Sequence, residues 1–201
     1  MKKLCILLFV GLVVSVMVLC SSQIIEAKGK KAGNVSELEE IENEKEEELE
    51  EETKGLKEKQ KNVHKNQNRV KVAVHSLLAM EDLVGGIGPE VSRIANEFNN
   101  SVEKTIRAEE RIRNKNRLIR FLLGGDKESA ELIAQEVNQN KGKIQQLKSL
   151  MEECDCDDEI KSTIKEQIMN IEAEQYRLEA FVEVEKGYSG IFGWIFDKLF
   201  N

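Results

Sequence analysis

Apolar residues recur at every seventh position over long stretches of this chain, and this spacing restricts the fold more than any other feature. One series comprises Leu49, Leu56, Val63, Val70, Leu77 and Val84, and the next comprises Val91, Ile94, Phe98, Val102, Ile112, Ile119 and Leu122. A seven-residue repeat places apolar side chains along one stripe of an α-helix, where they face a partner helix. The two series therefore predict two long helices that pack through their apolar stripes.

Residues 85–89, which contain three glycines and Pro89, separate these two series. Proline cannot occupy a helix interior but suits the first turn of a helix, so the chain should turn here. If the helices fold back on each other, Leu77 faces Phe98 and, in the same register, Leu56 faces Ile119. We therefore expect an antiparallel hairpin.

The second half of the sequence repeats this design around the segment 154–157. Its two series are Ile133, Val137, Asn140, Ile144, Leu147 and Met151, and then Ile160, Ile164, Ile168, Ile171, Gln175, Leu178 and Val182. Asn140 and Gln175 are polar members of these stripes, and such residues fix register at some cost in stability. The predicted fold is all-α, built of long antiparallel hairpins in either a coiled coil or an up-down-up-down four-helix bundle.

The remaining segments differ in composition from these helices. Residues 36–60 hold twelve Glu and four Lys, and Ser36 with Glu39 matches the capping-box pattern at a helix start. The expected layout is a signal peptide or N-terminal membrane anchor (1–27), a basic linker and Glu-rich helical stalk (28–55), the first hairpin (56–123), the second hairpin (126–186) and an aromatic amphipathic tail (187–201).

The N-terminus has the design of an export signal. Lys2 and Lys3 precede an uncharged, mostly apolar run over residues 4–20, which is intermediate in length between a signal peptide and a membrane-spanning helix. Cleavage after Ala27 or Ser22 fits the small residues there, whereas Leu19 disfavours lipidation of Cys20. We expect an exported protein that is either membrane-anchored or extracellular.

The C-terminal tail holds half of the aromatic residues of the chain. The residues predicted to contact a membrane or a partner are Ile191, Phe192, Trp194, Ile195, Phe196, Leu199 and Phe200. The tail is too short to span a bilayer, but an amphipathic segment of this kind suits a membrane interface. Docking on the end of the bundle or against another copy is the alternative.

Charge argues against nucleic acid as a partner. The chain has 30 Lys and Arg against 37 Asp and Glu, a net charge of −7, whereas phosphate contacts require an excess of basic residues. Residues 104–120 are locally basic but lack neighbouring aromatics for base stacking. We expect this stretch to be a solvated helix flank compensated by Glu residues of neighbouring helices, with anionic lipid as the alternative.

Few residues suggest chemistry. A disulfide between Cys154 and Cys156 is predicted in an exported protein, with a plain turn capped by Asp157 or Asp158 and a metal site as alternatives. The pair lacks the further ligands of a structural zinc site. His64 and His75 are three helical turns apart and are expected at the surface.

No catalytic set, cofactor motif or metal-ligand cluster emerges from the sequence, so we expect a protein that is not an enzyme and that needs no cofactor. Asn34 and Asn99 lie in sequons that would accept glycans in an exported protein.

Three segments resemble uncharacterised exported coiled-coil proteins of methanogenic archaea. They are residues 83–89 (Leu-Val-Gly-Gly-Ile-Gly-Pro), residues 98–101 with 105–110, and the Gly-Ile-Phe-Gly-Trp sequence near the C-terminus. The resemblance covers about a third of the chain and implies an archaeal envelope setting but no activity. We therefore expect a structural or interaction role at the cell envelope, with partners that are a membrane and either a second protein or further copies of the chain.

Two other functions fit the sequence. One is an extracytoplasmic binding or sensor module that uses the turn from Cys154 to Asp158 for metal or redox sensing. The other is a membrane-active helical effector that acts through the tail.

Overall fold

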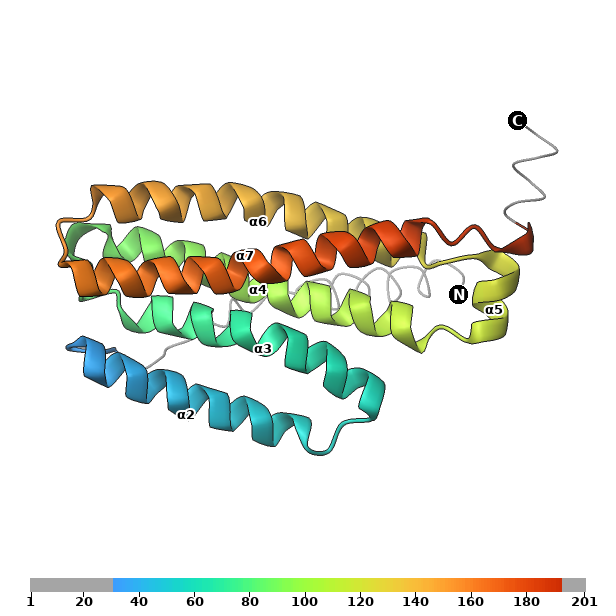
Figure 1. Ribbon diagram of the computed structural model, residues 1–201, viewed down its shortest axis with the longest axis horizontal. Helices are drawn as coiled ribbons and strands as arrows, with labels where there is room; N and C mark the ends of the chain where they lie inside the picture. Colours follow the sequence, from blue (N-terminus) through green and yellow to red (C-terminus); the bar gives the residue numbers. More distant parts are fainter. Residues whose placement is uncertain (1–30, 193–201) are drawn as a thin grey trace, which may run out of the picture.

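Four long helices form the body of the molecule in the computed structural model, which describes residues 31–192 (Figure 1). They are α3 (Glu58–Ala79), α4 (Gly88–Asn114), α6 (Lys127–Glu153) and α7 (Asp158–Lys186). α3 packs against α4, α4 against α6, α6 against α7, and α7 against α3, so the helices close into a ring. The all-α prediction is confirmed, and the two hairpins pair with each other in an up-down-up-down bundle.

The helix ends show why the chain turns where it does. Pro89 lies in the first turn of α4, directly after the short 3₁₀ helix η2 (Gly85–Ile87). Asp126 caps α6 by accepting a hydrogen bond from the Ser129 amide, and Asp157 caps α7 by accepting one from the Ile160 amide. Each cap satisfies an amide that has no acceptor within its own helix. These starts agree with the sequence pattern.

The polar residues in the second hairpin meet inside the bundle. Asn140 donates its amide hydrogens to Gln175 Oε1 at 3.0 Å and to Ser101 Oγ of α4 at 2.8 Å. Both Asn140 and Gln175 are buried. Sliding α6 along either neighbour would leave these buried groups without partners, so the contact fixes the register of three helices.

The N-terminal helix departs from the prediction of an overhanging stalk. α2 (Val35–Thr53) ends before Gly55, and the chain then reverses and packs α2 along α3. Leu38, Ile41 and Leu49 are buried as a result. An overhang would leave this apolar stripe in water, whereas folding back buries it.

The start of α2 is also two residues earlier than predicted. Asn34, not Ser36, is the N-cap: its Oδ1 accepts a hydrogen bond from the Glu37 amide at 2.9 Å. Glu37 in turn accepts hydrogen bonds from the Asn34 side-chain amide at 3.2 Å and from the backbone amide of Gly33, the residue before the N-cap, at 2.6 Å. The described chain begins beside the end of α3, where the Ala32 amide bonds the Ala79 carbonyl at 2.9 Å.

The second helix of the first hairpin is shorter than predicted. α4 ends at Asn114, and Asn116 caps a separate seven-residue helix, α5 (Arg117–Leu123), by accepting a hydrogen bond from the Leu118 amide. The predicted pairing of Ile119 with Leu56 is therefore wrong, and Ile119 is exposed. α3 begins at Glu58 and accompanies α4 to its last turn, where Lys59 Nζ bonds the Arg113 carbonyl at 3.1 Å, so no part of α3 lies beside α5.

No helix among residues 31–192 has the length and apolar content needed to cross a membrane. The predicted signal or anchor over residues 1–27 lies outside the described residues.

Docking of α2 involves a half-buried carboxylate. Glu42 Oε1 accepts hydrogen bonds from Ser76 Oγ of α3 at 2.5 Å and from Gln167 Nε2 of α7 at 3.1 Å. Burial raises the pKa of Glu42, the Ser76 hydrogen bond opposes this shift, and the nearby Glu166 carboxylate adds to it. The buried charge of ionised Glu42 thus weakens the docking of α2, whereas the hydrogen bonds that Glu42 accepts strengthen this docking.

The raised pKa gives a stability prediction. A carboxyl whose pKa is higher in the folded state contributes stability that is fully present below the unfolded-state pKa and is lost as the pH rises through the folded-state pKa. Glu42→Gln retains an acceptor for Ser76 without the charge, so it should raise the urea midpoint at pH 7 more than at pH 4. Glu40→Gln, at an exposed position of the same helix, should change neither midpoint. Equal effects of the two substitutions would contradict a raised pKa at Glu42.

Candidate functional site

Exposed apolar side chains gather at one end of the bundle. Eight of the eleven large apolar side chains exposed among residues 31–192 belong to α5 or to the chain after α7. These eight, which we call the apolar end, are Leu118, Ile119, Phe121, Leu122, Leu123, Tyr188, Ile191 and Phe192. α5 lies beyond the ends of the long helices, beside the chain that leaves α7 (Figure 1). None of its residues is buried.

A buried carboxylate holds the apolar end to the bundle. Glu185 of α7 is only 1% exposed, pairs with the Arg120 guanidinium of α5, and accepts a hydrogen bond from the Asp126 amide at 2.7 Å. The Arg120 guanidinium also lies 4.4 Å from the centre of the Tyr188 ring. α5 and the start of α6 are thus joined to the end of α7 around one charge.

Two glycines let these segments approach closely. Gly124 and Gly190 both have positive φ, 90° and 64°, a region that other residues rarely adopt. A Cβ on Gly190 would lie 2.3 Å from the Gly124 nitrogen. The Gly125 amide donates a hydrogen bond to the Tyr188 carbonyl at 2.9 Å across this contact.

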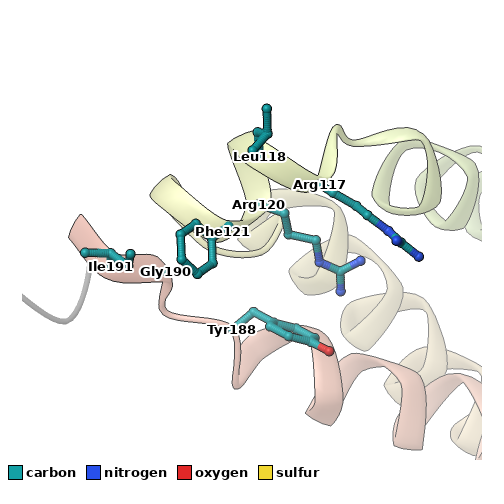
Figure 2. Close-up of a pocket in the computed structure, with 7 residues that line it drawn as sticks. All are labelled: Arg117, Leu118, Arg120, Phe121, Tyr188, Gly190 and Ile191. Atoms are coloured by element: carbon teal, nitrogen blue, oxygen red, sulfur yellow. The ribbon is translucent and has the colours of Figure 1, made fainter.

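The apolar end encloses a hollow of about 900 Å³. Figure 2 shows its lining, which comprises Arg117, Leu118, Arg120 and Phe121 of α5 and Tyr188, Gly190 and Ile191 of the chain after α7. The lining is mainly apolar, and its charged members are both arginines. Within the described residues, the buried Nε of Arg120 has no hydrogen-bond partner. The hollow therefore combines apolar walls with cationic groups.

The basic stretch that leads into this site is partly neutralised by other helices, as expected. Lys104 pairs with Glu136 of α6, and Arg120 pairs with Glu185 of α7. Arg117 is exposed, and none of the ion pairs recorded among residues 31–192 includes it. Arg117 thus places one unpaired positive charge at the apolar end.

The two cysteines lie at the opposite end of the bundle. Cys154 and Cys156 are joined as a disulfide, and Cys154 is buried with its Sγ 3.8 Å from the Val84 carbonyl oxygen. The α6–α7 turn therefore packs on the turn after α3. Within residues 31–192, no three His, Cys, Asp or Glu side chains are grouped as a metal site would require.

The histidines are less exposed than the sequence suggested, because α2 and α4 cover parts of α3. His64 Nε2 lies 3.5 Å from Glu110 Oε1, and His75 lines a hollow of about 220 Å³ with Lys45 and Lys71. Burial, followed by the nearby Lys45 charge, lowers the pKa of His75. The two histidines do not share a site.

The remaining predicted positions fall in three places. Ile191 and Phe192 are 40% and 46% exposed at the apolar end, whereas Trp194, Ile195, Phe196, Leu199 and Phe200 lie outside the described residues. Asn34 is the N-cap of α2 and bonds Glu37. Asn99 is half-buried on α4, and Ser101 of its sequon is buried in the core.

Sequence reasoning missed the role of α5, which it assigned to the seam of the first hairpin. The available signal is the density of apolar residues: five of the seven residues of α5 are large and apolar. A heptad seam buries only two or three positions in seven, so such a helix cannot bury all its apolar side chains against one partner.

No known protein family matches this chain, and no curated protein or solved structure is significantly similar to it.

The glycine contact can be tested by adding a methyl group. Gly190→Ala should separate the chain after α7 from α5, because its Cβ would clash with the backbone at Gly124, and hydrogen exchange at the Gly125 amide should become faster. Gly142→Ala is the matched control: a Cβ there contacts nothing within 4 Å, so it should stabilise α6 by roughly 0.5–1 kcal/mol. Unchanged Gly125 exchange in Gly190→Ala would show that the contact does not hold the apolar end.

Proposed function

We propose that this protein is an exported or membrane-anchored helical bundle that serves as a structural or interaction element at the cell envelope and has no enzymatic activity. The observation that supports the proposal best is the concentration of exposed apolar side chains at the apolar end. Apolar patches exposed on otherwise well-packed proteins commonly mark contact with a protein or a membrane.

The buried charges support a structural role for the rest of the bundle. Glu109 contacts Arg113 and Arg177, Glu136 contacts Lys104, and Glu185 contacts Arg120. Each buried carboxylate is thus already paired with a cation, which is typical of a structural ion pair. A catalytic base instead faces a cavity in which substrate can bind.

The first prediction from this proposal concerns location. In a host competent for export, the chain should reach the envelope in one of two forms. It either retains residues 1–27 and stays in the membrane, or it is cleaved and released as a protein whose first residue is near Lys28. Fractionation followed by intact-mass measurement distinguishes the two forms. A variant with Lys2→Glu and Lys3→Glu keeps the same bundle but loses the positive charge before the apolar run, so it should stay in the cytoplasm. Cytoplasmic wild-type protein that retains Met1 would contradict the proposal.

A second candidate function is a redox-responsive module at the opposite end. It is favoured by the contact between the Cys154–Cys156 disulfide and Val84, which couples the α6–α7 turn to the turn after α3. A change in the disulfide therefore acts first on the turn after α3.

This candidate predicts that reduction loosens the neighbouring turn. Reduced protein should exchange amide hydrogens faster over residues 80–88, and reoxidation should restore the slow rate. Peptide mapping of the thiols should follow Cys154 and Cys156 in the same samples. A Cys154→Ala and Cys156→Ala variant is the control and should not respond to reductant over these residues. Identical exchange in oxidised and reduced wild type would eliminate the sensor function.

A further inference from the structure

We infer that the apolar end is a docking surface for a bilayer that contains anionic lipids, with α5 lying in the interface and Arg117 facing the headgroups. This inference rests on the proposed function, because it names the partner of the same surface. The occupant follows from three features: the distribution of apolar side chains, the charge, and the chain that continues from this end.

The apolar side chains of α5 do not form a narrow stripe for one partner helix. Leu118, Phe121 and Leu123 are 70%, 62% and 66% exposed, and Ile119 and Leu122 are exposed as well. A single packed helix buries residues on one stripe only. A bilayer interface can take up side chains over a broad face, and the long side chain of Arg117 can extend to the headgroups.

The charge of the surface favours anionic headgroups over a second copy of the chain. α5 contains two arginines and no acidic residue, and residues 187–192 contain no charged residue. The nearest acidic partner, Glu185, is buried and already paired with Arg120. A symmetric contact between two apolar ends would bring their unpaired Arg117 side chains together, which costs energy, whereas anionic lipid attracts this charge.

The hollow adds a chemical fit. Its apolar walls lie beside two guanidinium groups, and the Arg120 Nε lacks an acceptor within the described chain. A lipid has this combination of apolar chains and an anionic headgroup with oxygen acceptors.

The chain also continues from this end with suitable residues. Nine residues follow Phe192, and they include Trp194, Ile195, Phe196, Leu199 and Phe200. Their composition suits the interface, where tryptophan is enriched.

The test moves the only tryptophan of the sequence onto α5. The full-length chain carrying Leu118→Trp and Trp194→Phe should show blue-shifted emission on vesicles of equal parts phosphatidylcholine and phosphatidylglycerol. Lipids brominated on their acyl chains should quench it. The matched control carries Met169→Trp and Trp194→Phe, since Met169 is similarly exposed, at 58%, but lies on α7 away from the apolar end. Its emission should not change.

Charge reversal tests the headgroup contact in the same assay. Arg117→Glu, made in the Leu118→Trp background, should raise the lipid concentration at half-maximal shift about thirtyfold, because one attraction is lost and one repulsion gained. Lys165→Glu makes the same charge change at an exposed position of α7 far from α5 and should have little effect. Equal weakening by both variants would overturn the assignment of Arg117.

Two further outcomes would overturn the inference. The first is sedimentation of the full chain with vesicles while the Leu118→Trp emission stays unchanged; binding would then come from another segment, and the envelope proposal would survive. The second is a blue-shifted emission without lipid in a protein that light scattering shows to be a dimer, because a second copy would then cover the apolar end. A lipid-dependent shift in a protein that stays cytoplasmic would instead support the inference and contradict the envelope proposal.

Discussion

A fully buried carboxylate, that of Glu109, joins α4 to α7 between the two apolar clusters of the core. It accepts hydrogen bonds from Arg177 of α7 at 2.6 and 3.1 Å and from Arg113 at 2.8 Å, and Arg177 also bonds Glu174. On one side of this network the core includes residues of α2 and α3, whereas on the other it is built from α4, α6 and α7 alone. Removing the partner of such a charge costs about 3–5 kcal/mol, so this network holds α4 and α7 together between the two clusters.

The exposed apolar end follows from the position at which α3 begins. α2 reverses before Gly55, so α3 starts at Glu58, beside the last turn of α4, and cannot continue alongside α5. A longer α3 would have covered Ile119 and neighbouring side chains. Without it, α4 stops, the chain turns at Asn116, and α5 is held through its arginine and the glycine contact, while its apolar side chains remain in solvent. The apolar end is thus exposed because α3 begins at Glu58. The residues of α5 nevertheless continue the apolar repeat of α4.

The hairpins were readable from sequence because each rests on many residues that agree. The repeat spacing, the glycine turns, the caps at Asp126 and Asp157 and the facing pair Asn140 and Gln175 all indicate the same register. The reversal near Gly55 was not readable, since a heptad series looks the same whether it runs through one helix or through two that use the same stripe. One glycine disfavours a continuous helix by only about 1 kcal/mol, which tertiary packing readily outweighs. The same ambiguity concealed α5, because its Ile119 and Leu122 fit the repeat without having a partner.

The reversal of α2 also determines how the two ends of the molecule relate to a membrane. The described chain begins beside Ala79, at the end of the bundle opposite α5 (Figure 1). α4 and α6, with 27 residues each, are about 40 Å long. The ten residues 21–30 between the apolar run and this start reach at most about 36 Å when fully extended. If residues 4–20 stay in a membrane and the bundle stands perpendicular to it, α5 therefore does not reach that membrane. The apolar end would then contact a second surface. A chain cleaved after Ala27 has no such restriction. Retention of residues 1–27 therefore predicts a protein that bridges two surfaces, whereas cleavage allows one that rests on a single bilayer.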